Sequence, residues 1–426
     1  MFFGDSAYQV IDTIHPSELS SESAYIGLEH IEQETLQLIG IGNPTKVTSN
    51  KRIFRKGDIL FGKLRPYFRK VIFADFDGIC STDIWVIRPK ENIDSKFLYY
   101  WCANWKFINF VNSASEGTRM PRAKWEVAIN HEIPNHTYEH QKIIGNILGS
   151  LDEKIKHNKK NNETLEEITK AIFKSWFIDF DPVRAKSECL STGLNNEISD
   201  SFPDSFEVSH LGEIPEGWKI HKLGDFIDIK GGLSYESQFI GSGKNLITMG
   251  CISPNKKFNF SGLKKYSGDF KESNLLRHKD IVISTRDVTQ DRVTLGAPAM
   301  VPKILDGSIV ATNLYKVIFI NKTLSCYFLF ESLKSKRYRE NIIASAKGST
   351  VLMLTRDSVL DYEIIVPKDD LMKKFHNLYE TMQRRYEIIN NEIETLVELR
   401  DQLLPKLISG ELRIPDAEKI IEEVGI

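Results

Sequence analysis

The chain has 426 residues, a length that favours two or three domains over a single hydrophobic core. Its 56 basic and 58 acidic side chains leave a net charge of −2, so the overall charge gives no indication of a polyanionic partner. The five cysteines are far apart and form no CxxC pair, which argues against a zinc ribbon or a disulfide framework. No apolar run approaches the roughly 20 residues of a membrane span and no signal peptide is evident, so we expect a soluble, cytoplasmic protein.

Positive charge is concentrated in residues 51–70. Against the single acid Asp58, this stretch carries the basic residues Lys51, Arg52, Arg55, Lys56, Lys63, Arg65, Arg69 and Lys70, with aromatic side chains between them. A local basic cluster on a nearly neutral chain is typical of proteins that contact nucleic-acid phosphates. A solvated strand edge protected by lysines explains the cluster equally well at this point.

The same stretch contains part of a phosphate-binding loop motif. Gly57, Gly62 and Lys63 fit its Gly-x4-Gly-Lys frame. However, Leu64 stands where the motif has the Ser or Thr that binds magnesium. The residues between the glycines, Asp-Ile-Leu-Phe, favour a β-strand over a loop whose amides cradle phosphates. We therefore interpret this segment as a strand and not as a nucleotide site.

An internal repeat relates the two halves of the chain. Asp58 in KGDIL corresponds to Asp280 in HKDIV, 222 residues later. Gly117 in SASEGT corresponds to Gly348 in SAKGST, 231 residues later. The offset drifts by only a few residues, as small loop insertions would cause. The glycines and lysine of the partial phosphate-loop motif do not recur in the second copy, whereas an arginine follows the strand in both.

Each copy contains a globule rich in predicted strands. The runs DILFGKL, GICSTDIWVI, DIVIST, SIVATNLYKVIFI and DYEIIVP are β-branched or aromatic and are bounded by turn residues. We predict an α+β chain with two similar mixed α/β globules, at residues 1–138 and 218–368. A polar connector over residues 181–217, rich in Ser, Asn, Asp and Glu, is predicted to be a linker, and residues 410–426 an acidic tail.

A long amphipathic helix is predicted after each globule, at residues 139–180 and 369–409. Apolar residues recur at alternating spacings of four and three in both segments, in the same register. We predict that the two helices pack antiparallel, like a coiled coil, with a pseudo-twofold relation between the copies. Asn158, Asn162 and Thr169 interrupt the apolar series and would favour one register. The predicted pairing residues are Ile144, Leu148, Leu151, Ile155, Leu165, Ile172, Phe375, Tyr379, Met382, Tyr386, Ile393, Leu396 and Leu403.

Three segments resemble a known family. They are IPNHTYEHQKIIGNILGSLDEKI (133–155), LEEITKAIFKSWFIDFDPV (165–183) and LGEIPEGWKIHKLGDF (211–226). They resemble the specificity (S) subunit of type I restriction-modification systems, and the order of globule and helix, twice over, extends the resemblance to nearly the whole chain. Two departures are visible: the second helix start, at 369–371, lacks the family signature, and the first globule lacks an obvious counterpart of WKIHKLGDFIDIKGG (218–232).

The resemblance implies a non-catalytic adaptor that reads a bipartite target in double-stranded DNA, with one half-site per globule. It implies that the helices fix the distance between half-sites and dock two methyltransferase (M) subunits, which restriction (R) subunits join. No cofactor or metal is expected on this chain, because S-adenosylmethionine, ATP and magnesium would bind the partner subunits. The alternative is a stand-alone bipartite DNA-binding scaffold or repressor without a methyltransferase partner.

Catalytic motifs are weak in this sequence. Residues 179–183 do not match the Asp-Pro-Pro-aromatic loop of an amino-methyltransferase, and a nuclease pattern through Asp204 and Asp228 is loose enough to arise by chance. His136 and His140 fit an HxxEH zinc frame, but they stand at a predicted helix start, where the intervening glutamate is explained by the helix dipole. We predict no catalytic residue, and a hydrolase with its own metal remains a third possibility.

Candidate DNA contacts follow from the repeat. Reading of base edges relies chiefly on Arg, Lys, Asn and Gln, and both copies place Arg and small polar residues after the same strand and in the same Gly-containing loop. The candidates in the first globule are Lys63, Arg65, Arg69, Thr118, Arg119, Arg122 and Lys124. The candidates in the second are Arg286, Gln290, Arg292, Lys347, Ser349, Thr350 and Arg356. For any one of them, a surface charge without a DNA contact is an equally good explanation.

Overall fold

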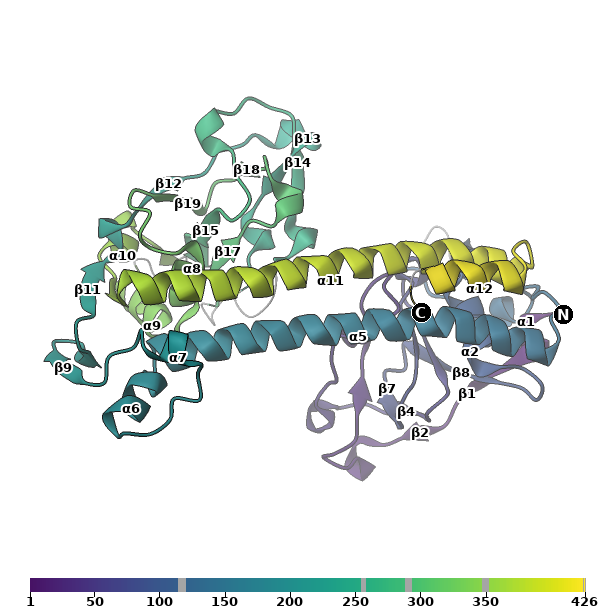
Figure 1. The fold of residues 1–426 in the computed structure, drawn as a ribbon. Helices are drawn as coiled ribbons and strands as arrows, with labels where there is room; N and C mark the ends of the chain where they lie inside the picture. Colours follow the sequence, from purple (N-terminus) through teal and green to yellow (C-terminus); the bar gives the residue numbers. More distant parts are fainter. Residues whose placement is uncertain (114–119, 254–257, 288–292, 347–351, 424, 426) are drawn as a thin grey trace. The chain divides into compact units, whose positions relative to one another are not determined.

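The computed structural model describes residues 1–113, 120–253, 258–287, 293–346, 352–423 and 425 (Figure 1). Two compact units make up the chain. Unit 1 comprises Met1–Asn162 with Glu387–Ile426, and unit 2 comprises Glu163–Tyr386. Among the described residues, no helix combines the length and the apolar character that crossing a bilayer would require.

The globule of unit 1 contains two four-stranded sheets. One has the order β1-β8-β5-β6 and is antiparallel, and the other has the order β2-β4-β7-β3, with β3 parallel to β7. The strands are β1 (Ala7–Val10), β2 (Thr13–Ile14), β3 (Tyr25–Ile26), β4 (Lys51–Phe54), β5 (Ile59–Gly62), β6 (Val71–Phe73), β7 (Gly78–Cys80) and β8 (Ile84–Pro89). The helices of this globule are α1 (Phe3–Ser6), α2 (Ser95–Ala103), α3 (Trp105–Ser113) and α4 (Trp125–Ala128).

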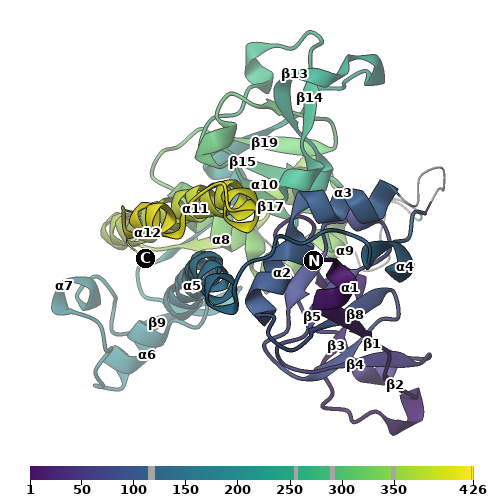
Figure 2. The same ribbon diagram turned by 90° about the vertical axis from the view of Figure 1, so that its right-hand side faces the viewer.

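The strand predicted from the partial phosphate-loop motif is confirmed as β5. Gly57 lies in the turn before the strand, with a positive φ of 91° that glycine adopts without strain. Ile59, Leu60 and Phe61 are then all buried, because β5 is flanked by β8 and β6 within the sheet and contacts α2. In unit 1, α2 lies between this sheet and the long helix α5 (Tyr138–Phe177) (Figure 2).

The globule of unit 2 repeats this plan. Its main sheet has the antiparallel order β12-β19-β15-β17, and a three-stranded sheet has the order β14-β13-β18, with β13 parallel to β18. The strands are β9 (Phe206–Ser209), β10 (Gly212–Pro215), β11 (Lys219–Lys222), β12 (Ile227–Gly231), β13 (Ile240–Ile247), β14 (Lys264–Tyr266), β15 (Ile281–Ser284), β16 (Arg286–Asp287), β17 (Pro298–Met300), β18 (Ile309–Val310), β19 (Leu314–Phe319), β20 (Leu352–Met353) and β21 (Glu363–Val366). The helices are α6 (Asp181–Ser187), α7 (Asn196–Ser199), α8 (Cys326–Lys334), α9 (Lys336–Ser345) and α10 (Arg356–Leu360).

The aspartates that first indicated the repeat occupy matching sites. Asp58 and Asp280 each accept a hydrogen bond from the backbone N–H three residues earlier, at 2.8 Å in both copies. Each is also paired with a cation on the neighbouring strand: Arg88 of β8 lies 2.7 Å from Asp58, and Lys316 of β19 lies 2.9 Å from Asp280. Two mixed α/β globules built on one plan are therefore confirmed.

The expectation that the first globule lacks a counterpart of residues 218–232 is wrong in part, because α1 and β1 are the counterpart of the segment that ends in β12. Asp5 accepts a hydrogen bond from the Phe2 N–H at 2.9 Å, as Asp225 accepts one from the Lys222 N–H at 3.1 Å. The strands that follow, β1 and β12, hold the same edge position in their sheets. The match is carried by a short Gly-Asp turn, too brief to stand out in sequence.

The long helices are α5 and α11 (Asp369–Ser409), and the second is followed by α12 (Ile414–Glu423). Within unit 1 their segments run antiparallel, because Asp152 pairs with Arg400 at 2.8 Å and Asn162 bonds Asn390 at 2.8 Å. Within unit 2, Thr169 lies 3.3 Å from the sulfur of Met382, in the same antiparallel sense. Every residue predicted for helix pairing is buried or half-buried.

Residues 181–217 are not the plain linker that their polar composition suggests. They form α6, α7 and the hairpin β9–β10, and several of their apolar residues enter the core of unit 2. Phe202 meets the Trp176 ring at a centroid distance of 5.4 Å, and Val183 and Ile214 are buried. Composition averages over a segment, whereas a handful of well-placed side chains is enough to fold it onto a neighbouring core.

The predicted acidic tail also contains ordered structure. α12 occupies much of residues 410–426, with Ala417 and Ile421 buried and its acidic side chains outward. The charge of this segment is therefore one face of an amphipathic helix.

Candidate nucleic-acid interface

The end of β5 brings two predicted candidate segments of the first globule together. The Arg65 N–H donates to the Pro121 carbonyl at 2.7 Å, and the Ala123 N–H donates to the Lys63 carbonyl at 2.8 Å. An isolated β-bridge joins the same two segments. Residues far apart in sequence thus form one surface just past the strand end.

Four cationic side chains lie on this surface. Arg122 and Lys124 are exposed, and Lys63 and Arg65 are half-buried. Arg122 pairs with Asp83 at 3.4 Å, but its side chain remains 60% exposed. Because an exposed pair of this kind contributes only about 0–1 kcal/mol, a phosphate could displace the carboxylate at little cost.

Arg65 is held in an unusual backbone conformation. Its φ of 51° is left-handed, and its guanidinium carbon lies 5.9 Å from the centroid of the Phe68 ring. A non-glycine residue pays about 1–2 kcal/mol for this conformation, which persists only where surrounding contacts impose it. Strain of this kind fixes the direction in which the Arg65 side chain leaves the strand end, beside the exposed cations.

Arg69 does not belong to this surface, contrary to expectation. Its side chain is 3% exposed, and its Nη2 lies 3.2 Å from Asp401 of α11. Its Nε donates to the Ala103 carbonyl at 2.7 Å, and its guanidinium lies 5.3 Å from the Trp105 ring centroid. A guanidinium satisfied and enclosed in this way is not available to DNA.

The basic cluster at 51–70 is therefore only partly a surface feature. Lys51 is buried and donates to the Ser49 carbonyl at 3.0 Å. Lys70 donates to a backbone carbonyl, and burial lowers the pKa of its amine. Arg55 and Lys56 are exposed at the turn before β5. Charge counts along the sequence overstate the positive surface, because several of these cations are buried or half-buried and hydrogen-bonded within the globule.

In the second globule the corresponding strand end is the pair β16–β20. Arg286 stands opposite Met353, whereas in the first globule the equivalent bridge joins Leu64 and Arg122. Arg286 is therefore the structural equivalent of Leu64 and not of Arg65, although an arginine follows the strand in both copies. Successive strand residues point to opposite faces, so a shift of one position changes the side from which an arginine projects.

Two candidate arginines are described in the second globule. Arg286 is half-buried, and within the described part of the chain its Nε has no hydrogen-bond partner. A donor in this state gains from an added acceptor such as a phosphate. Arg356 is exposed and pairs with Asp228 of β12, and this hydrogen bond lowers the pKa of the Asp228 carboxyl.

Half of the predicted candidates lie outside the described residues. They are Thr118, Arg119, Gln290, Arg292, Lys347, Ser349 and Thr350.

The residues of the possible zinc frame take part in local structure. His136 hydrogen-bonds through Nε2 to the Ile408 carbonyl at 2.9 Å, and its ring packs edge-on against Phe97 at 5.7 Å. Across the described ranges, no cluster of three or more His, Cys, Asp or Glu residues is placed to hold a metal ion.

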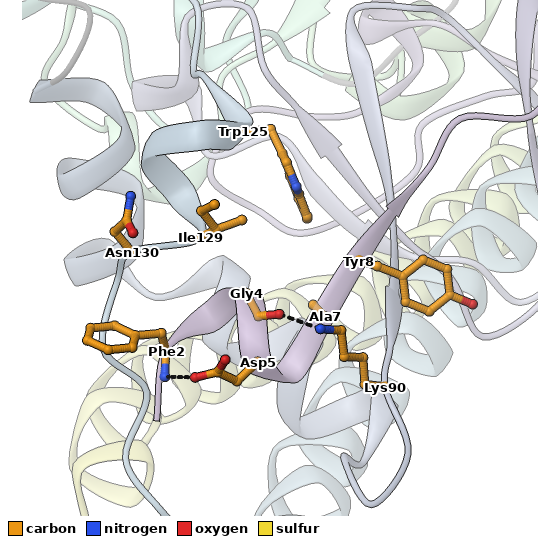
Figure 3. A pocket seen from close by; sticks show the side chains of 9 residues that line it. All are labelled: Phe2, Gly4, Asp5, Ala7, Tyr8, Lys90, Trp125, Ile129 and Asn130. Carbon is orange, nitrogen blue, oxygen red and sulfur yellow. Dashed lines mark hydrogen bonds between the residues drawn. The ribbon is translucent and has the colours of Figure 1, made fainter.

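A hollow of about 440 Å³ beside β1 was not anticipated from the sequence (Figure 3). Aromatic side chains from three elements reach it, and its lining residues are Phe2, Gly4, Asp5, Ala7, Tyr8, Lys90, Trp125, Ile129 and Asn130. In the second globule the equivalent edge carries ion pairs, Lys222 with Asp361 at 2.8 Å and Arg356 with Asp228. The two copies thus differ at this edge, a difference that only the alignment of α1 with the Gly-Asp turn at 223–225 makes visible.

Comparison with known proteins supports the repeat. A model of the type I restriction modification DNA specificity domain matches residues 21–167 and again residues 215–397. The chain is 28% identical over 378 residues to the type I restriction enzyme MjaIX specificity subunit of Methanocaldococcus jannaschii, covering 86% of this chain and 80% of the relative. It is 27% identical over 421 residues to the HindI specificity subunit of Haemophilus influenzae, covering 85% and 88%.

A solved structure shares the fold. The crystal structure of a type I restriction-modification S subunit from M. genitalium matches with a TM-score of 0.51 at 15% identity, covering 96% of this chain and 95% of that chain. The family model matches twice, and each match takes in parts of one globule and of the long helix that follows it. From this double match and the repeated fold, we conclude that the chain belongs to the family of type I restriction-modification DNA specificity proteins.

Proposed function

We propose that this chain is the DNA sequence-specificity subunit of a type I restriction-modification enzyme, and that each globule reads one half of a bipartite target in double-stranded DNA. The observation that carries the proposal is one globule built twice, with the same strand order and the same strand-end pairing, in a chain of the DNA specificity family. Two copies of one reading module suit two half-sites on one duplex.

The proposed reading surface of each globule is its strand end. In the first globule, Lys63, Arg122 and Lys124 would bind phosphates and orient the protein, while Arg65 is aimed by its constrained backbone. Arginine can contact guanine with two parallel hydrogen bonds, which gives about 1–3 kcal/mol of discrimination for each base pair read in this way. In the second globule, Arg286 would take the corresponding role, although it stands one position earlier than the equivalent of Arg65.

The long helices are proposed to set the distance between the half-sites and to dock two methyltransferase subunits. The paired faces are buried, so docking would use the outer faces. These carry exposed apolar side chains among charged ones, such as Ile168 on α5 (42% exposed) and Ile388 on α11 (58% exposed). In this proposal residues 1–138 and 218–368 read DNA, and residues 139–180 and 369–409 form the spacer.

The proposal leaves the chemistry to partner subunits. Methyltransferase subunits would bring S-adenosylmethionine, and restriction subunits would bring ATP and magnesium. The stand-alone scaffold or repressor is less well supported, because the family description names a restriction-modification system.

Mapping of methylated adenines in cells that express the chain with its methyltransferase tests this function. We expect one modified motif with two specified parts separated by a fixed unspecified gap, together with co-purification of the methyltransferase. Purification of the chain alone, with DNA binding but no modified bases, would support the scaffold alternative instead.

A further inference from the structure

Two buried arginines and two half-buried aspartates form a group in unit 1. Arg400 of α11 is 0% exposed, and its Nη1 lies 2.8 Å from Asp152 Oδ1 on α5. Its Nε and Nη2 lie 3.2 and 3.1 Å from Asp401 Oδ1. Arg69 of the first globule completes the group, with its Nη2 3.2 Å from the same Asp401 oxygen. We call these four residues the charged quartet.

The charged quartet ties the first globule to both helices. Arg400 donates to the Thr35 carbonyl, in the loop before β4, at 3.3 Å. Arg69 donates to the carbonyl that ends α2 at 2.7 Å. Tyr100 of α2 donates its hydroxyl to the second oxygen of Asp152 at 2.6 Å. A loop, a turn and a helix of the globule thus converge on one set of charges.

Other residue types stand at the equivalent positions of the second copy, so the charged quartet is not required by the shared fold. The residues at the positions equivalent to Arg400, Asp401, Asp152 and Arg69 are Thr169, Lys170, Gln383 and Gly296. In unit 2, α11 contacts the globule through Tyr379, whose hydroxyl donates to buried Glu331 at 3.0 Å and whose ring stacks on Tyr327 at 4.4 Å. The next residue, Glu380, pairs with Lys279 of the globule at 3.1 Å.

Arg400 keeps its charge at any physiological pH. Burial opposes the charge on Arg400, but Asp152 and Asp401 outweigh that effect and raise its pKa. Hydrogen bonds between opposite charges are short and directional, and a buried charge that loses its partner is strongly disfavoured. The quartet therefore imposes one orientation, where purely apolar packing would tolerate small rotations.

We propose that Arg400 is a positioning residue for the first globule, so that a residue of the second repeat governs the accuracy with which the first globule reads its half-site. This inference rests on the proposed function. Discrimination between bases needs donors held within about 0.5 Å of their acceptors, so a globule that shifts on its helices loses selectivity before it loses phosphate contacts. The half-site of the second globule, mounted through Tyr379 and its neighbours, should be unaffected.

Hydrogen exchange of the full chain without DNA directly tests how firmly the first globule is held on the long helices. The variants are Arg400→Met, Arg400→Lys as the conservative replacement, and Tyr379→Phe as the matched control in unit 2. We expect amides of α2 and of the loop at 32–37 to exchange about tenfold faster in Arg400→Met and less so in Arg400→Lys, with the amides of unit 2 unchanged. Unchanged exchange at these amides, or equal acceleration in both units, would overturn the proposal.

The modified motif provides the second readout, with the chain bound to its methyltransferase. We expect Arg400→Met to relax base selectivity only in the half-site that Lys63→Ala and Arg122→Ala weaken, with partial rescue by Arg400→Lys. Relaxation of both half-sites, or the same relaxation by Tyr379→Phe, would reduce Arg400 to general stability and refute the inference. If the wild type gave no bipartite motif, the proposed function would be contradicted. The hydrogen-exchange data would still test whether Arg400 holds the first globule in place on the helices.

Discussion

The two units build the same globule but attach it to the long helices by different chemistry. In unit 1 the attachment is ionic, with Arg69 of the globule paired with Asp401 of α11 at 3.2 Å, beside Arg400. In unit 2 it is mainly aromatic, with Tyr327 of α8 stacked on Tyr379 of α11 at 4.4 Å, beside one ion pair between Lys279 and Glu380 at 3.1 Å. Ionic contacts are directional and fail when one partner is lost, whereas aromatic packing scales with buried area. A shared fold therefore leaves open how firmly, and in which direction, each copy is held.

The largest difference between the units is expected in the loss of stability when the residue at one repeat position of the helix pair is replaced. Leu151 is 0% exposed, whereas its counterpart Met382 is half-buried beside Thr169. Leu151→Asp should cost more than about 4 kcal/mol by burying an unpaired charge, and Met382→Asp clearly less. Denaturant unfolding measures both, and a sizing column measures recruitment of the methyltransferase.

The matched control for this pair is Asn391→Asp, because that polar side chain is exposed on the same helix as Met382. Normal assembly of the Leu151→Asp chain on the sizing column would count against the paired-helix arrangement.

The ionic and aromatic attachments can be compared by removing one group from each. Arg400→Met leaves Asp152 without its cation, while Asp401 keeps Arg69, and should lower the free energy of unfolding by about 2 kcal/mol because the carboxylates are partly exposed. Tyr379→Phe removes one hydrogen bond to Glu331 and should cost about 1 kcal/mol. Adding Asp152→Asn to Arg400→Met should cost less than the sum of the single changes, by about 1 kcal/mol. Strict additivity in this thermal-unfolding cycle would show that the charges do not cooperate.

The strand ends of the two globules give a smaller contrast, in binding and not in stability. Arg65→Ala should weaken binding to the half-site of the first globule by about 1–2 kcal/mol, and Arg286→Ala should do the same for the second. Titration of duplexes with one half-site altered at a time separates the two effects. Unchanged affinity in both variants at physiological salt would remove these arginines from the interface.

The smallest effect at neutral pH concerns Tyr327 of unit 2. Burial raises the pKa of its phenol to about 12, whereas the unfolded chain ionises near 10. Between these values the unfolded state releases a proton that the folded state keeps, so the free energy of unfolding falls as pH rises. Tyr327→Phe should flatten this fall in unfolding curves from pH 9 to 12. The exposed Tyr67→Phe should leave it unchanged, and an identical slope in both variants would refute the assignment.

The features that could be predicted from sequence are those with a local signal. A short apolar run bounded by turn residues identifies β5, and the spacing of four and three that runs through Leu151 and Leu396 identifies the paired helices. The repeat also predicts the order of the elements, because the two copies can be aligned with each other. The family resemblance follows from three short segments, at 133–155, 165–183 and 211–226, two of which lie at the ends of the first long helix.

The features that were mispredicted depend on partners distant in sequence. Arg69 was assigned to DNA because its neighbours are basic, yet its side chain is enclosed by Asp401, 332 residues away. The connector at 181–217 was assigned as a linker from composition, yet Val183, Phe202 and Ile214 are buried, with Phe202 against the Trp176 ring.

By itself the sequence determined two mixed globules, two long paired helices and the family to which the chain belongs, because periodicity and repetition are properties of the linear order. Tertiary structure decided which cations face solvent and which are enclosed, how the Gly-Asp turn at the chain start matches the one at 223–225, and that Arg400 of the second copy contacts the first globule. These features arise from contacts between segments hundreds of residues apart, and a linear pattern carries no record of which charges meet.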